Sequence, residues 1–198
     1  GSNVGSAAAL TFQFGLQNDG AVEMTTTGAG YSVAITVASG SLVNGSTGTI
    51  TSLAGAGGTR VLAAQLDNQG TVSLPYDLTL AQASAAHLNS GTITTTGTAD
   101  FALVQSGTTP SFTNTGTITL AAGRTMSVSA GLLDLSAGLV QGSTAFLTTT
   151  GSPTVRFSTA TVQPRIGFAA GTVLPDPFVI PATDSLRIYS GTFAPPSL

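Results

Sequence analysis

The sequence predicts an all-β protein built as a right-handed parallel β-helix, also called a β-solenoid. Three observations predict this fold: a short motif recurs along the chain, apolar and polar residues alternate after each copy, and helix-forming charged residues are nearly absent. The motif pairs an asparagine with a glycine two residues later, as in FTNTGTITLAAG from Phe112 to Gly123.

The glycines of the motif set the period of the repeat. Successive copies are 28, 22, 21 and 25 residues apart, and a degenerate copy, LDLSAGLV, follows after another 22 residues. A drifting period of about 21–28 residues without a helical segment is typical of one solenoid coil per copy, because corners between strands tolerate insertions. The glycines are Gly20, Gly48, Gly70, Gly91, Gly116 and Gly138.

The residues that follow each glycine alternate as in a half-buried strand. In GTITL, Ile118 and Leu120 point to one side of the strand, and Thr117 and Thr119 point to the other. Coils stacked about 4.8 Å apart would therefore align the aliphatic residues in one buried column. The expected column contains Val22, Ile50, Val72, Ile93 and Ile118.

The asparagine and the glycine are expected to form the corner between two strands. An asparagine side chain bonds nearby backbone groups, and glycine adopts positive φ without steric cost. On stacked coils, Asn68, Asn89 and Asn114 should form a ladder in which each amide bonds to the next coil.

Composition limits the classes of partner. The 198 residues are 41% hydrophobic but only 7% charged, against about 25% in ordinary soluble domains. The net charge is −3 and the arginines are scattered, so we expect no nucleic-acid partner. Asp, Ser and Gly interrupt the apolar stretches well before the roughly 20 residues of a spanning helix, so we expect no membrane insertion. There is no cysteine and no phosphate-binding or calcium-binding motif, so we expect no cofactor and no metal site. An export to the cell surface or the extracellular space fits this composition.

The chain divides into two parts of one domain. Residues 1–142 carry the coils with Asn-x-Gly motifs, and residues 143–198 are expected to form irregular terminal coils or a cap. Seven of the nine prolines lie in this second part, and prolines block edge-to-edge pairing of strands. An antiparallel β-sandwich is the alternative fold.

The repeats resemble those of bacterial surface β-solenoids of the filamentous haemagglutinin and autotransporter passenger kind. The resemblance rests on the LxNxGTIxL copies and the following AAGRTMSVSAG, and it covers roughly residues 16–140. It implies a bacterial extracellular or cell-surface protein that serves in adhesion, cell-cell contact or surface structure. It also implies that the chain is a segment of a longer surface protein or filament, whose partners are other protein subunits or adjoining segments.

A second function is suggested by the outward residues that flank the buried column. On stacked coils they would form two rows of hydroxyl groups, which resemble the faces of ice-binding β-solenoids; threonine is also simply a good residue for an exposed strand. The candidate surface consists of Thr49, Thr51, Thr71, Ser73, Thr92, Thr94, Thr117 and Thr119.

Catalytic signals are weak, so we predict that the protein is not an enzyme. His87 is the only histidine and has no acidic neighbour in sequence, which favours a surface or corner position. The eight acidic residues are scattered, although stacked coils could bring some of them together in a glycan-cleaving or glycan-binding β-helix. Against glycan binding, the chain has no tryptophan, and Tyr31, Tyr76 and Tyr189 do not share a position in the repeat.

Overall fold

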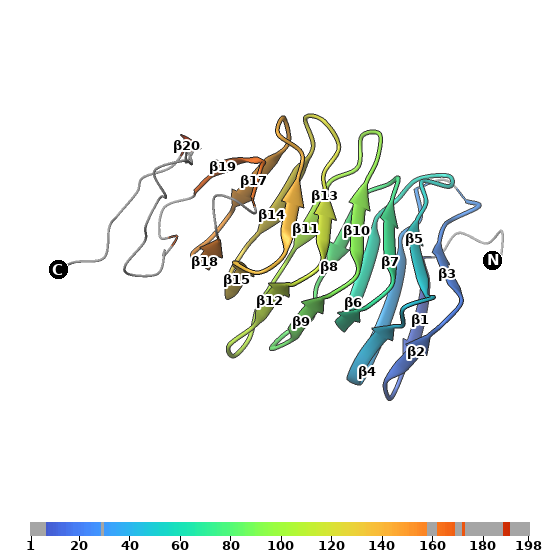
Figure 1. Cartoon of the computed structure of the whole chain (residues 1–198). Coiled ribbons are helices and arrows are strands. Elements are labelled where there is room, and N and C mark those ends of the chain that lie inside the picture. The colour runs from blue at the N-terminus through green and yellow to red at the C-terminus, as the bar shows by residue number, and fades with distance from the viewer. Residues whose placement is uncertain (1–6, 29, 158–161, 169–171, 173–187, 191–198) are drawn as a thin grey trace.

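The chain winds into a parallel β-solenoid of about seven turns, seen from the side in Figure 1. The computed structural model describes residues 7–28, 30–157, 162–168, 172 and 188–190. Every strand pairing in this part of the chain is parallel, and none of its residues is helical. The predicted all-β class and solenoid architecture are confirmed, whereas an antiparallel sandwich would need antiparallel pairs.

Each full coil contributes strands to three faces that surround one core. Faces 1 and 2 belong to one 14-stranded sheet, because the long strands β4 and β6 run around the corner between them, and face 3 is a separate 6-stranded sheet. Face 1 consists of β1 (Ala8–Phe12), the first halves of β4 (Val33–Asn44) and β6 (Arg60–Asn68), β8 (Leu78–Leu80), β11 (Phe101–Leu103), β14 (Thr125–Val128), β17 (Phe146–Thr149), β19 (Arg165–Gly167) and β20 (Ile188–Ser190).

The other two faces follow the same order along the axis. Face 2 consists of β2 (Leu16–Asn18), the second halves of β4 and β6, β9 (Ala86–Asn89), β12 (Ser111–Asn114), β15 (Leu132–Leu135) and β18 (Thr154–Phe157). Face 3 consists of β3 (Ala21–Met24), β5 (Thr49–Ser52), β7 (Thr71–Leu74), β10 (Thr92–Thr95), β13 (Thr117–Thr119) and β16 (Leu139–Gln141).

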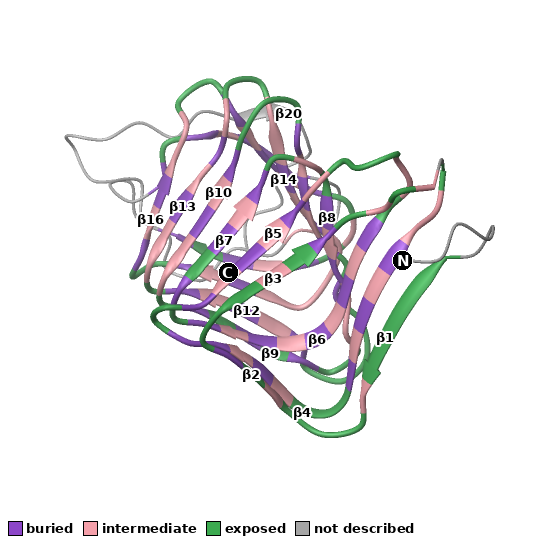
Figure 2. Ribbon diagram, turned by 90° about the vertical axis from the view of Figure 1, so that its right-hand side faces the viewer, coloured by how far each residue is buried: buried purple, intermediate pink, exposed green. Residues whose placement is uncertain are grey.

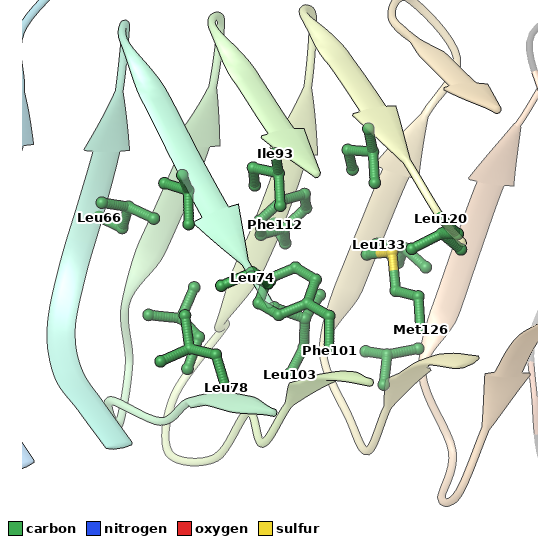
Figure 3. Packing of buried hydrophobic residues seen from close by; sticks show 14 of the residues in the cluster. Leu66, Leu74, Leu78, Ile93, Phe101, Leu103, Phe112, Leu120, Met126 and Leu133 are labelled. Carbon is green, nitrogen blue, oxygen red and sulfur yellow. The ribbon is translucent and has the colours of Figure 1, made fainter. Parts of the chain in front are cut away.

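Inward side chains from the three faces stack in columns that fill the solenoid, as Figure 3 shows for the middle coils. The predicted column on face 3 is confirmed: its members pair in register, and Ile50, Val72, Ile93 and Ile118 are at most 1% exposed. A column on face 2 adds Leu66 and Phe112 to the same core. No single coil could bury these residues alone, because each residue of a column is covered by the residues of the two neighbouring coils.

The predicted asparagine ladder is confirmed and is longer than expected. Each side-chain Nδ2 donates a hydrogen bond of 2.6–2.7 Å to the Oδ1 of the asparagine in the next coil. All members are buried, so the ladder pairs polar groups that would otherwise lack partners inside the protein. It runs through Asn18, Asn44, Asn68, Asn89 and Asn114.

The reason for glycine at the same corner differs from the predicted one. None of the motif glycines has a positive φ. Instead, a Cβ on Gly91 would collide with the carbonyl oxygen of Gly70, and a Cβ on Gly116 would collide with that of Gly91. The prediction of positive φ was wrong, because close stacking of the corners, not backbone conformation, demands the absence of a side chain.

The expected proline-rich cap falls largely on residues that the structure does not describe. In the described residues after 142, β17, β18 and β19 continue the parallel stacking of the preceding coils.

Candidate functional site

The eight hydroxyl residues of the predicted surface all lie on face 3 and alternate with the buried column, so they point outward. Figure 2 shows this alternation of buried and less buried positions along the strands of face 3. Neighbouring members of a row are therefore about 4.8 Å apart along the axis, and the two rows are about 6.6 Å apart. The first row runs through Thr49, Thr71, Thr92 and Thr117, and the second through Thr51, Ser73, Thr94 and Thr119.

Other residue types end both rows of hydroxyls. Ala21 precedes the first row and Leu139 follows it, whereas Glu23 precedes the second row and Gln141 follows it. The array is thus four coils long, and its chemistry is that of short neutral hydroxyls and methyl groups.

His87 is not at the surface, and the prediction of a surface or corner position was wrong. The side chain is 2% exposed and takes an inward position of face 2, in register with Leu66 and Phe112. Its Nδ1 accepts a hydrogen bond of 3.1 Å from the backbone N–H of Leu66. The strand pairing with β6 is interrupted between Leu80 and Leu88, and the His87 side chain supplies a partner for this N–H there, so His87 has a structural role.

Burial lowers the pKa of His87 from its ordinary 6.5 to about 4. The unfolded chain therefore binds a proton at a higher pH than the folded chain does. We expect the free energy of unfolding to be constant above pH 6.5 and to fall by about 3 kcal/mol in total as the pH drops to 4.

Urea unfolding at pH 7.5, 6, 5 and 4.5 measures this loss. Because carboxyl groups also titrate near pH 4.5, the comparison should use His87→Gln, which keeps a hydrogen-bond acceptor but does not titrate. The variant should lose less stability than the natural chain between pH 7.5 and 4.5, and equal losses would contradict the assignment.

Two of the acidic residues, Asp67 and Asp134, are too far apart to form a carboxylate pair. Asp67 and Asp134 share one outward row of face 2, but Leu88 and Thr113 lie between them, about three coil spacings in all. No group of three or more histidine and acidic side chains in the described ranges could hold a metal ion.

Two other carboxylates stabilise a corner. Asp77 Oδ1 accepts a hydrogen bond of 2.8 Å from the backbone N–H of Asp100 in the next coil. Asp100 Oδ1 in turn accepts one of 2.7 Å from the N–H of Thr125 and lies 3.8 Å from Arg124 Nε. Stacking therefore brings these acids together, but as partners of backbone groups.

Arg60 is a buried polar residue that the sequence analysis did not single out. It is 1% exposed and takes an inward position of face 1, in register with Val33. Its guanidinium carbon lies 5.2 Å from the centre of the Tyr76 ring, so Arg60 covers one face of this ring. The alternation of the run RVLAAQL, in which Leu62, Ala64 and Leu66 point inward, could have revealed that Arg60 does so too.

The guanidinium of Arg60 holds the corner between face 3 and face 1. Burial lowers the pKa of Arg60, but hydrogen bonds of 2.7–3.3 Å from all three of its nitrogens compensate for the loss of water. The acceptors are the carbonyl oxygens of Met24, Leu53, Ala54, Gly57, Gly58 and Thr59 and the hydroxyl of Thr26.

A shallow groove of about 450 Å³ crosses the corner between faces 1 and 2 in the later coils. Its lining includes Thr109, Ser111, Ser152 and Thr154 but no charged or aromatic side chain. The groove therefore lacks the stacking surface that would favour a sugar ring.

Comparison of the chain with protein-family models, with curated proteins and with solved structures finds no match. The fold class is thus defined by the strand pairing itself. In the described residues no helix is long and apolar enough to span a membrane.

Proposed function

We propose that the protein is a non-enzymatic structural or adhesive β-solenoid of a bacterial cell surface or of the extracellular space. In this role the chain is a stiff segment of a longer surface protein or filament, and its partners are other protein subunits, adjoining segments or surface glycans. The observation that carries the proposal is the continuity of the interior: buried columns and the asparagine ladder pass from coil to coil without interruption from β2 to β12.

An interior of this kind favours a mechanical role. Neighbouring coils are joined by parallel backbone pairs on each face and, as far as Asn114, by one buried amide, so bending the stack would break many bonds at once. The outer surface, in contrast, carries mostly short neutral side chains, which suits weak and repeated contacts between cells better than capture of one small ligand.

The proposal is tested by displaying the chain on a non-adherent bacterium with an established surface carrier. We expect increased cell aggregation, or retention under flow on immobilised glycans or extracellular proteins, relative to the carrier displaying Ile93→Asp. Unchanged attachment would contradict the adhesive role. Polysaccharide turnover that a single Asp→Asn change abolishes would contradict the non-enzymatic one.

Ice binding is a second candidate, favoured by the regular register of the two hydroxyl rows on face 3. If this surface binds ice, crystals grown in the protein should become faceted, and Thr92→Lys should restore rounded growth. Thr113→Lys is the matched control, because Thr113 is half-buried on the outward row of face 2. Rounded crystals with the natural chain would remove this candidate.

A further inference from the structure

The first coil exposes the ends of the core columns. Leu10, Leu16 and Val22 belong to the first coil and begin inward columns on faces 1, 2 and 3. Each pairs in register with a residue of the second coil that is at most 5% exposed. Leu10 itself is 53% exposed, and Figure 2 shows most of β1 as exposed. Neither β1 nor β2 contains a proline or a charged residue, which are the usual means of protecting an edge strand.

The asparagine ladder has a direction, and its open acceptor lies at this same end. Each Nδ2 also donates to a backbone carbonyl of the next coil, as Asn18 does to Thr49 and Asn44 to Thr71, which fixes the orientation of the amides. The Oδ1 of every later asparagine accepts from the coil before it. Asn18 Oδ1 accepts only a long bond of 3.3 Å from the N–H of Gly20, so it can still accept an amide from an added coil.

Gly20 gives an independent indication of what the added coil is. A Cβ at Gly70, Gly91 or Gly116 would collide with the carbonyl oxygen of a glycine in the preceding coil. A Cβ at Gly20 would meet none of the described atoms within 4 Å, and Gly20 does not have a positive φ. Nothing in the isolated coil therefore requires glycine here, whereas a stacked Asn-x-Gly corner would.

We propose that the first coil is a docking surface for one further β-solenoid coil, stacked in parallel, that carries an asparagine at an Asn-x-Gly corner. The inference rests on the proposed structural function and names its partner at this end. The asparagine of the added coil donates to Asn18 Oδ1 and to the carbonyl of Ala21, and its corner glycine packs against Gly20.

The partner is a different solenoid segment and not a second copy of this chain. Two first coils that met end to end would place one Asn18 Oδ1 acceptor against another, with no donor between them. A head-to-tail contact also supplies no asparagine, because the described residues at the ladder position after Asn114 are Leu135 and Phe157. The sequence contains no asparagine after Asn114.

The test adds a coil to the complete chain. A duplicate of residues 78–100 replaces residues 1–7, so that its last residue precedes Ala8 as Asp100 precedes Phe101. We expect the thermal midpoint to rise by at least about 3 °C and the backbone amides of β2 and β3 to become protected from hydrogen exchange. The same duplicate carrying Asn89→Leu should lose most of this rise.

Gly20→Ala is the decisive variant. It should leave the midpoint of the natural chain unchanged within about 1 °C but remove the rise produced by the added coil, because its Cβ blocks the corner. Gly91→Ala, the matched control, should lower the midpoint in both contexts.

Three results would overturn the inference: no rise with the added coil, equal rises with asparagine and leucine, or equal effects of Gly20→Ala in both contexts. A dimer of the natural chain that Gly20→Ala abolishes in sedimentation would also overturn it, since the partner would then be a second copy. If the coil docks but displayed chains attach no cells, the docking surface stands and only the adhesive role fails.

Discussion

Ile93→Asp should prevent folding or reduce the free energy of unfolding by more than about 4 kcal/mol. Ile93 is 0% exposed and lies in the column between Val72 and Ile118, so both of its column neighbours are aliphatic. A coil that cannot pack also exposes its neighbours, so the loss should spread along the stack. Circular dichroism and urea unfolding of the purified chain measure the effect.

Two nearby variants control for the mutation. Ile93→Val shortens the same side chain by one methylene group and should cost about 1 kcal/mol. Thr94→Asp places the same carboxylate one residue away on the outward side and should be tolerated. A stable, cooperatively folded Ile93→Asp protein would show that this column is not the core.

Arg60→Leu should lower the free energy of unfolding by about 3 kcal/mol or more. Leucine fits the apolar column, in which Val33 and Leu78 are the neighbours, but it donates no hydrogen bond. Each of the six carbonyl oxygens that accept from the guanidinium would lose this donor, so the corner before β6 should open. Hydrogen exchange at residues 53–60 and urea unfolding report the two effects.

Arg60→Lys and Arg124→Leu separate charge from geometry. A lysine keeps the charge, but its single ammonium group cannot reach all the carbonyls that surround the planar guanidinium of Arg60. The Arg60→Lys variant should therefore be more stable than Arg60→Leu but less stable than the natural chain. Arg124 is partly exposed and donates to the carbonyls of Thr98 and Gly123, so its loss should cost less than about 1 kcal/mol. Equal losses at Arg60 and Arg124 would contradict the structural role of the buried group.

Much of the architecture could be predicted because every coil of a solenoid repeats the same arrangement of strands and corners. The two-residue alternation identified the inward residues Ile50, Val72, Ile93 and Ile118, and the glycine spacing placed them in register. The same spacing placed the outward threonines on one face. Stacking converts each of these sequence periods directly into a contact between neighbours.

Features that depend on how individual atoms of neighbouring coils pack, and not on the repeat alone, were not predictable in the same way. Local sequence explains a corner glycine by its φ, whereas the structure explains it by the carbonyl oxygen stacked against it. His87 is buried where its ring accepts a hydrogen bond from Leu66 of the preceding coil, opposite a gap in the strand pairing that the sequence does not mark. Arg60 is buried because a neighbouring corner supplies enough acceptors, and no motif in the sequence marks that corner.

The most direct test of the stacked-coil account measures distances along face 3. The chain contains no cysteine, so pairs of introduced cysteines can be spin-labelled without background. With one label at Ala21 and the second at Thr71, Thr92, Thr117 or Leu139, pulsed electron paramagnetic resonance should give distances that grow by about 4.8 Å per step. The account predicts this constant increment although the sequence gaps differ, and distances that fail to increase steadily would contradict it.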